Sequence, residues 1–263
     1  MMLSSYHTHS TFSDGKSTLE EMVQSAIASG CREIGFSDHA PMIFDCEWSI
    51  KAEKLERYKK EVTALKEKYK DKIKIYLGIE QDYFSVPAEG YDYIIGSVHY
   101  ILKDGEYLPN DLSADAMKEF VDRCYGGDVY AYCEDYFKLM GEVVSVTGCQ
   151  IIGHFDIVTK FNERLPMIDT NHPRYVKAVD EALAKLLKTD AIFEVNTGAI
   201  SRGYRTSPYP DNCTLDKIAK SGKPFVITSD THNKETVTFH FTEEQEKLDK
   251  KGYKYIESLE EIL

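Results

Sequence analysis

Two histidines near the start of the chain, His7 and His9 in the stretch SSYHTHSTFSDG, are separated by one residue. If this stretch is a strand, both imidazoles project from the same face, because side chains alternate along a strand. Such a pair is well placed to coordinate one metal ion. The same spacing also occurs at exposed strand ends and in turns, so the pair alone is weak evidence for a metal site.

Similar residues recur where the other predicted strands end. They are Asp38 and His39, Glu80, His99, His154 and Asp156, Glu194 and Asn196, and Asp230 and His232. A single histidine at a strand end is usually a hydrogen-bonded structural residue, and a single aspartate there often caps a turn. However, six of the eight histidines lie at such positions, and imidazole and carboxylate are ligands of zinc, iron and manganese. The recurrence at strand after strand predicts a site for several metal ions.

Short apolar runs alternate with longer segments of helical periodicity along the chain. The runs predict seven strands, at residues 4–10, 32–39, 73–83, 91–101, 149–158, 191–198 and 224–232. Helices are predicted at residues 18–30, 51–71, 114–124, 129–147, 173–189 and 214–222. Ser17 and Glu20 are predicted to form the capping box of the first helix. This alternation is typical of parallel strands joined by crossover helices.

A closed or nearly closed β/α barrel in one domain fits a chain of 263 residues. Continuous apolar runs such as IKIYLGI and PFVIT indicate strands that are buried on both faces. The alternative, an open doubly wound sheet, is less favoured because no GxGxxG follows the first strand. The carboxyl ends of barrel strands converge at one mouth, so the ligand-type residues are expected to meet there.

The composition narrows the classes of partner. The net charge of −12 argues against nucleic acid. No apolar run reaches the length of a membrane span and no signal segment is recognised, so we expect a cytoplasmic protein without a membrane partner. Six cysteines without a CxxC pair indicate reduced thiols rather than a disulfide or zinc-finger framework. The sequence leaves open whether the protein forms a homo-oligomer.

The blocks HTHSTFSDG, GFSDHAP, GIEQDYF, GSVHYI, GHFDIV and VITSDTH resemble, in this order, the PHP (polymerase and histidinol phosphatase) superfamily of metal-dependent phosphoesterases. With EVNTGAISRGYRTSPYP before the last strand, the chain most resembles the histidinol-phosphate phosphatase branch. The resemblance implies a distorted (β/α)7 TIM-like barrel of PHP fold, with residues 1–263 in a single domain. A C-terminal helical tail, at about residues 242–263, is expected to pack on the barrel.

The resemblance also implies two to three divalent transition metals, which would be zinc, iron or manganese. The implied ligands are His7, His9, Glu80 and Asp230 for the first metal, Glu80, His99 and His154 for the second, and Asp14, His39 and His232 for the third. Many relatives have a histidine where this chain has Asp14. This departure leaves the identity and occupancy of the third metal open.

The implied reaction is hydrolysis of L-histidinol phosphate to L-histidinol and phosphate in histidine biosynthesis. A hydroxide that bridges two metals is the expected nucleophile. Asp230 is expected to accept its proton and pass it to the leaving alkoxide, and His232 competes for the acid role. Arg202 follows the sixth strand and is predicted to act in catalysis by clamping the phosphate. Its alternative role is a salt bridge that holds its loop. The other predicted substrate contacts are Lys160, His39 and Ser97.

Other functions stay open on the sequence. The enzyme could hydrolyse another phosphate ester, such as a nucleotide, an oligonucleotide or phosphotyrosine, although the acidic charge weighs against long nucleic acid. A metal-binding module without catalysis is a second alternative, and the complete ligand set weighs against it. A third is a metal-dependent amidohydrolase, but the chain offers no clear candidate for the metal-binding lysine of those enzymes.

Overall fold

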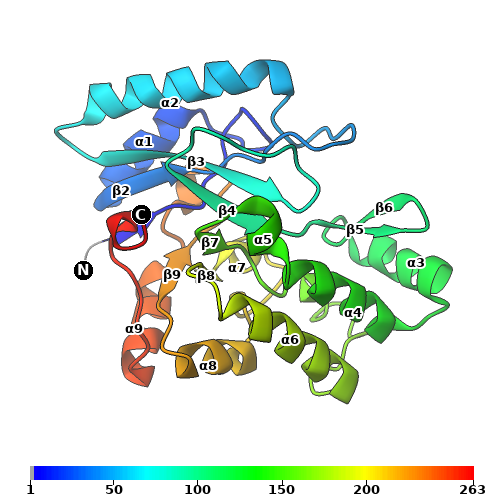
Figure 1. Ribbon diagram of the computed structural model, residues 1–263. Coiled ribbons are helices and arrows are strands. Elements are labelled where there is room, and N and C mark those ends of the chain that lie inside the picture. Colours follow the sequence, from blue (N-terminus) through cyan, green and yellow to red (C-terminus); the bar gives the residue numbers. More distant parts are fainter. Residues whose placement is uncertain (1–2) are drawn as a thin grey trace.

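Seven parallel strands form the central sheet of the computed structural model, which describes residues 3–263 (Figure 1). Along the sheet, the strands are β1 (Leu3–Ser5), β2 (Cys31–Phe36), β3 (Lys74–Asp82), β4 (Tyr93–Ser97), β7 (Ile151–Ile152), β8 (Ile192–Asn196) and β9 (Phe225–Thr228). Sequential order without a reversal is typical of a barrel rather than of a doubly wound sheet. Residues 1 and 2 of the predicted domain lie outside the described part of the chain.

The sheet closes on itself beyond the ends of β1 and β9. Thr8 and Thr231 form a parallel bridge there. The His9 amide donates to the Thr231 carbonyl at 2.9 Å, and the Thr231 amide donates to the His7 carbonyl at 3.1 Å. The barrel is distorted, because β1 has three residues and β7 only two. These contacts confirm the predicted seven-stranded β/α barrel in a single domain.

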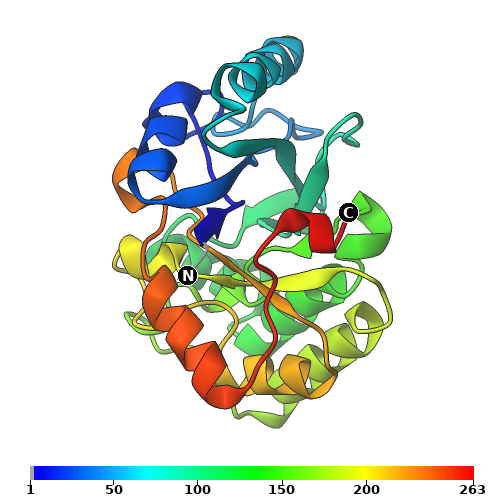
Figure 2. The ribbon, with the colours of Figure 1, turned by 90° about the vertical axis from the view of Figure 1, so that its left-hand side faces the viewer.

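Helices cover the outside of the barrel (Figures 1 and 2). They are α1 (Leu19–Ala28), α2 (Leu55–Tyr69), α3 (Ala114–Tyr125), α4 (Val129–Met140), α5 (Val143–Thr147), α6 (Pro173–Leu186), α7 (Gly198–Ser201), α8 (Asn212–Lys220) and α9 (Phe241–Lys251). Apolar residues at helical spacing face the sheet, as expected for amphipathic helices. No helix within residues 3–263 is long and apolar enough to cross a membrane.

Large side chains fill the barrel interior below the mouth. Tyr93 lies where a side chain at Gly78 would stand, since a Cβ there would be 2.3 Å from the tyrosine ring. Tyr6, Ile256 and Leu259 belong to the same buried cluster, so the segment after α9 packs against the barrel strands. The interior is therefore a packed core, and polar chemistry is confined to the carboxyl ends of the strands.

Two local predictions about helices are wrong. The capping box is formed by Thr18 and Glu21: the Thr18 amide donates to the Glu21 carboxylate at 2.9 Å, and the Glu21 amide donates to the Thr18 hydroxyl at 3.3 Å. Ser17 instead accepts from the Lys234 amide at 3.2 Å, a tertiary contact that local sequence does not reveal.

The predicted helix 129–147 is divided at Gly141 into α4 and α5.

The predicted strand 91–101 is also divided. After β4 the chain turns, and β5 (Tyr100–Lys103) pairs with β6 (Glu106–Pro109) in an antiparallel hairpin outside the barrel sheet. Asp104 and Gly105 form its turn with φ values of +50° and +84°. Asp-Gly between alternating residues is a strong hairpin signal. The sequence favours one continuous strand here, because Val98, Tyr100 and Ile101 follow closely on the apolar residues of β4.

Candidate metal centre

The nine predicted ligand residues converge at the carboxyl ends of the barrel strands. Four groups bring ligand atoms within 4.8 Å of one another. The groups are His7, His9 and Asp230; His7, Glu80 and His154; His39, Glu80 and His99; and His9, Asp14, His39 and His232. Parallel strands present their carboxyl ends at one edge, which is why residues up to 225 positions apart in sequence meet. The overlap between groups indicates a cluster of adjoining sites rather than one isolated site.

Glu80 lies at the centre of the cluster and is almost completely buried. Oε2 lies 2.8 Å from His39, 3.3 Å from His7 and 3.6 Å from His9, and Oε1 lies 3.0 Å from His154 and 3.5 Å from His99. Burial by itself would raise the pKa of this carboxyl, but the imidazoles of His39, His7 and His99 hold it well below its usual range. An ionised carboxylate with imidazoles at both oxygens is suited to bridge two metal ions.

Several buried polar atoms of the cluster make no hydrogen bond to any residue from 3 to 263. They are His7 Nε2, both ring nitrogens of His9, Glu80 Oε2 and His154 Nδ1. Buried polar atoms are nearly always paired in native proteins. Burial and the neighbouring imidazoles of His232 and His39 lower the pKa of His9 to about 3, so its ring is neutral, as a metal ligand must be. The donor set therefore fits transition-metal ions.

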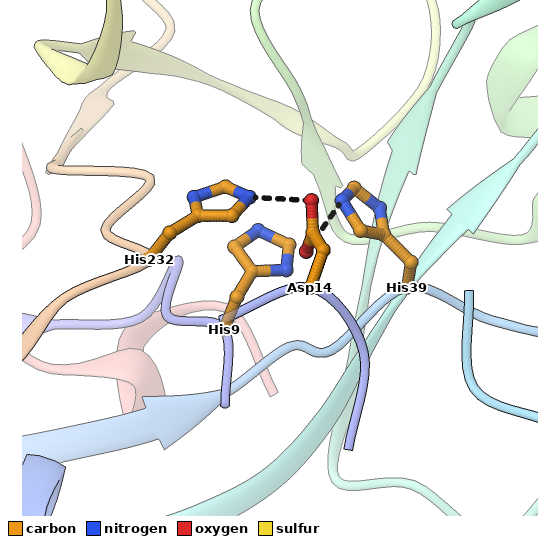
Figure 3. Close-up of side chains that lie close together, drawn as sticks. All are labelled: His9, Asp14, His39 and His232. Carbon is orange, nitrogen blue, oxygen red and sulfur yellow. Dashed lines mark ion pairs between the residues drawn. The ribbon is translucent and has the colours of Figure 1, made fainter. Parts of the chain in front are cut away.

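Asp14 completes the group nearest to solvent, where its carboxylate lies between two imidazoles (Figure 3). Oδ2 is 3.3 Å from His232 Nε2, and Oδ1 is 3.6 Å from His39 Nε2. The loop that carries Asp14 is folded tightly against the barrel, since a Cβ at Gly15 would lie 2.6 Å from the His9 carbonyl. The structure thus aims the Asp14 carboxylate into the third predicted site.

Glu194 of β8 is one of the polar residues at the predicted strand ends but not one of the nine implied ligands, and it contacts two of those ligands. Its Oε2 contacts His7 Nδ1 at 2.8 Å and accepts from the Thr228 hydroxyl at 2.7 Å. Its Oε1 accepts from the backbone amide of His154 and from the Asn196 side chain. One buried carboxylate therefore fixes the ring of one predicted ligand and the backbone of another. The feature of the sequence that points to this role is a glutamate within the apolar run AIFEVN, where a buried charge needs a partner.

Glu194→Gln is expected to reduce metal affinity or kcat/KM by about 10- to 100-fold, because carboxylates that orient metal-bound histidines have effects of this size. The amide keeps the shape of the side chain but loses the charge that holds His7. Metal content by elemental analysis and steady-state kinetics measure the effect. Glu244→Gln is the matched control, since Glu244 is also buried but lies in α9, where it contacts Lys247. Equal behaviour of the two variants would remove this role from Glu194.

Asp82 orients the predicted ligand His99, as Glu194 orients His7. Its Oδ2 accepts from the His99 amide at 2.6 Å and lies 3.2 Å from His99 Nδ1. Ser97, a predicted substrate contact, is completely buried with its hydroxyl 3.3 Å from the same nitrogen. In this position the Ser97 hydroxyl supports the ring of His99, and the substrate contact of Ser97 stays a prediction. His39 has its two ring nitrogens directed at Glu80 and Asp14, and its substrate contact stays a prediction.

Arg202 is bound to a predicted ligand. Its Nη2 lies 2.9 Å from Asp230 Oδ2, and its Nη1 donates to the Asp230 carbonyl at 2.8 Å. Asp230 has a φ of +45°, a conformation that is uncommon for non-glycine residues and often found at functional sites. The salt bridge that was the alternative role is therefore present. The predicted phosphate contact of Arg202 would have to be shared with this salt bridge, and it stays a prediction.

Lys160 is also paired within the chain. Its Nζ lies 3.0 Å from the Asp111 carbonyl and 3.1 Å from Asp111 Oδ2, and its side chain is 10% exposed. A substrate contact by Lys160 would have to share the ammonium with this aspartate. The sequence did not single out Asp111, because it lies in a loop without a recognisable motif.

Comparisons with known proteins agree with this geometry. The PHP domain family model matches residues 5–198. The histidinol-phosphatase of Bacillus subtilis is 27% identical over 253 residues, which cover 86% of this chain and 92% of that protein.

Two solved structures show the same fold. A hisK structure from Listeria monocytogenes has a TM-score of 0.80 at 21% identity and covers 92% of this chain and 99% of the other. The structure of histidinol phosphate phosphatase from Lactococcus lactis, complexed with zinc, L-histidinol and phosphate, has a TM-score of 0.68 at 22% identity and covers 96% and 95% of the two chains. The family model extends over most of the residues that build the barrel and the metal centre. The chain therefore belongs to the PHP domain family.

Proposed function

We propose that this protein is a metal-dependent phosphomonoesterase that hydrolyses L-histidinol phosphate to L-histidinol and phosphate, a reaction of histidine biosynthesis. The observation that carries the proposal is the set of overlapping ligand groups that share Glu80 at the barrel mouth. The relative named histidinol-phosphatase and the Lactococcus lactis complex with L-histidinol and phosphate support this choice of substrate.

The metal centre is proposed to hold two to three divalent ions of zinc, iron or manganese. His7, His9, Glu80 and Asp230 would hold the first, Glu80, His99 and His154 the second, and Asp14, His39 and His232 the third. When bound, such ions neutralise phosphate oxygens and make water a nucleophile at neutral pH. Zinc in the Lactococcus lactis structure supports this assignment.

Asp230 is the proposed proton acceptor. Burial by itself would raise the pKa of its carboxyl, but Arg202 and His7 hold the pKa well below its usual range, so the group is ionised. Arg202 fixes Oδ2, while Oδ1 faces His9 at 3.2 Å. One oxygen is thus oriented by the protein and the other is directed into the metal centre, as a positioned base requires.

Asp230 is also proposed to pass the proton to the leaving alkoxide, and His232 competes with it for this acid role. The His232 side chain is 22% exposed, so one edge of the ring faces the mouth. Its Nδ1 lies 3.1 Å from the Asp230 carbonyl oxygen and 3.3 Å from the Arg202 guanidinium. Arg202 is 30% exposed and is proposed to face the phosphate while it holds Asp230.

L-Histidinol phosphate is expected to give the highest kcat/KM in a phosphate-release panel with nucleotides, phosphotyrosine, an oligonucleotide and simple monoesters. Chelation should remove the activity, and elemental analysis of active protein should find two to three transition metals per chain. If another ester in the same panel has a higher kcat/KM, the protein is a PHP phosphoesterase with a different substrate. Full metal content without hydrolysis of any ester would favour a binding module, and less than one metal per chain would contradict the metal centre.

A further inference from the structure

Two segments outside the barrel sheet rise beside the metal centre, and each is fastened to a predicted ligand. The loop at residues 40–50 returns to the barrel where the Ile50 amide donates to the His39 carbonyl at 3.0 Å. The β5–β6 hairpin returns where the Asn110 amide donates to the His99 carbonyl at 2.8 Å. Side chains near these points are therefore held at a fixed position relative to His39 and His99.

Trp48 from the loop and Tyr100 from the hairpin form an aromatic wall at the mouth. Their rings are nearly parallel, and Trp48 Nε1 donates to the Tyr100 hydroxyl at 3.2 Å. The centroid of Trp48 lies 4.5 Å from that of His39 and 5.5 Å from that of His99. Both wall residues are only partly buried. The wall thus offers an aromatic surface next to the place where a phosphate ester would react.

Asp111 stands beside this wall. Pro109 pairs with Tyr100 in the hairpin, and Asn110 is bonded to His99, so Asp111 emerges next to both. Its side chain is 30% exposed. Although burial opposes ionisation, Lys160 and the imidazoles of His99 and His154 lower the pKa of Asp111 to about 2. Lys160 contacts Oδ2, and no residue from 3 to 263 donates a hydrogen bond to Oδ1.

An ionised carboxylate at the mouth repels the phosphate on which the enzyme acts. The same carboxylate stabilises a bound ester whose alcohol part carries a positive charge, because a charged hydrogen bond then forms in a partly desolvated site. A planar cation would also be attracted to the aromatic faces of the wall. Nucleotides and bisphosphates have anionic or uncharged alcohol parts. They therefore form neither the charged hydrogen bond to Asp111 nor the cation–π contact with the wall.

Building on the proposed function, we propose that Asp111 and the aromatic wall of Trp48 and Tyr100 bind the alcohol part of the ester and select esters of a cationic, planar alcohol. Asp111 acts on specificity: it takes no part in the attack on phosphorus. The metals and Asp230 would cleave any monoester that reaches them, and the loop and hairpin decide which ester is bound well.

Asp111→Asn tests the selection, because it keeps the side-chain shape and removes the charge. In metal-loaded full-length protein, kcat/KM for L-histidinol phosphate is expected to fall about ten- to a hundredfold. For phenyl phosphate, whose alcohol is planar and uncharged, kcat/KM should rise because a repulsive charge is lost. Asp180→Asn is the matched control: Asp180 also pairs with a lysine, Lys217 at 2.6 Å, but on the exposed side of α6, and its loss should change neither value.

Binding gives a second readout that does not depend on turnover. Trp48 is the single tryptophan of the chain, so its fluorescence reports on ligands at the wall. L-Histidinol should change this fluorescence in a saturable manner, and its affinity should be about ten- to a hundredfold lower in Asp111→Asn. Inorganic phosphate should bind this variant at least as tightly as it binds the unchanged protein.

Equal losses for both esters, or equal affinity of L-histidinol for both proteins, would overturn the inference. Failure of the proposed function has a different signature. If the unchanged protein prefers another cationic ester, such as phosphoethanolamine, and Asp111→Asn removes that preference, the role of Asp111 holds and the substrate is wrong. If the unchanged protein prefers phenyl phosphate to both cationic esters, selection by Asp111 is wrong.

Discussion

Glu80→Gln is expected to lower kcat/KM by about 10³-fold or more, which is the scale of the several kcal/mol that bound metals supply to phosphoryl transfer. The glutamine has the same shape, but it replaces one of the two carboxylate oxygens by an amide donor. Glu80 faces five imidazoles, so the change affects both metals that it is proposed to bridge. Elemental analysis should show that the variant has lost metal, and added metal should restore little activity.

General destabilisation must be separated from this effect. Glu33→Gln serves as the control, because Glu33 is a glutamate of β2 that accepts from Tyr6 and Ser258 at the end of the barrel away from the metals. Both variants should be compared by thermal unfolding in the presence of chelator. If Glu80→Gln retains full metal content and activity, the bridging role is wrong.

Asp230→Asn is expected to lower kcat by about 10²- to 10⁴-fold, the usual contribution of a positioned base. Asparagine is nearly isosteric and keeps an oxygen as a metal ligand, but it cannot accept the proton. It also leaves the Arg202 guanidinium without its carboxylate partner, which is now 2.9 Å away. The measurement is steady-state kinetics on protein whose metal content equals that of the unchanged enzyme.

The pH profile separates proton transfer from metal loss. If Asp230 is the base, the rate of the fully loaded variant should recover at higher pH, where hydroxide replaces the missing base. Asp216→Asn is the control, since Asp216 pairs with Lys251 on the protein surface. Unchanged kcat in fully metallated Asp230→Asn would exclude Asp230 from proton transfer.

The sequence by itself determined the barrel and the convergence of the ligands. Apolar runs separated by helical periodicity require parallel strands, and parallel strands place residues such as His99 and His154 at a common edge. The spacing of His7 and His9 then puts both rings on one face. These conclusions depend only on periodicity and on the direction of the strands, which local sequence carries.

The partners of individual side chains were decided only by the tertiary structure. Periodicity indicates on which face a residue lies, but not which side chain of a distant strand stands opposite. Hence the sequence did not reveal that Glu194 holds His7, that Arg202 is bound to Asp230, or that Ser97 is buried beneath His99. Each depends on contacts between segments brought together by barrel closure. The position of Asp111 was likewise hidden, because it is set by a backbone hydrogen bond at the base of a hairpin whose first two residues the sequence places in the fourth predicted strand.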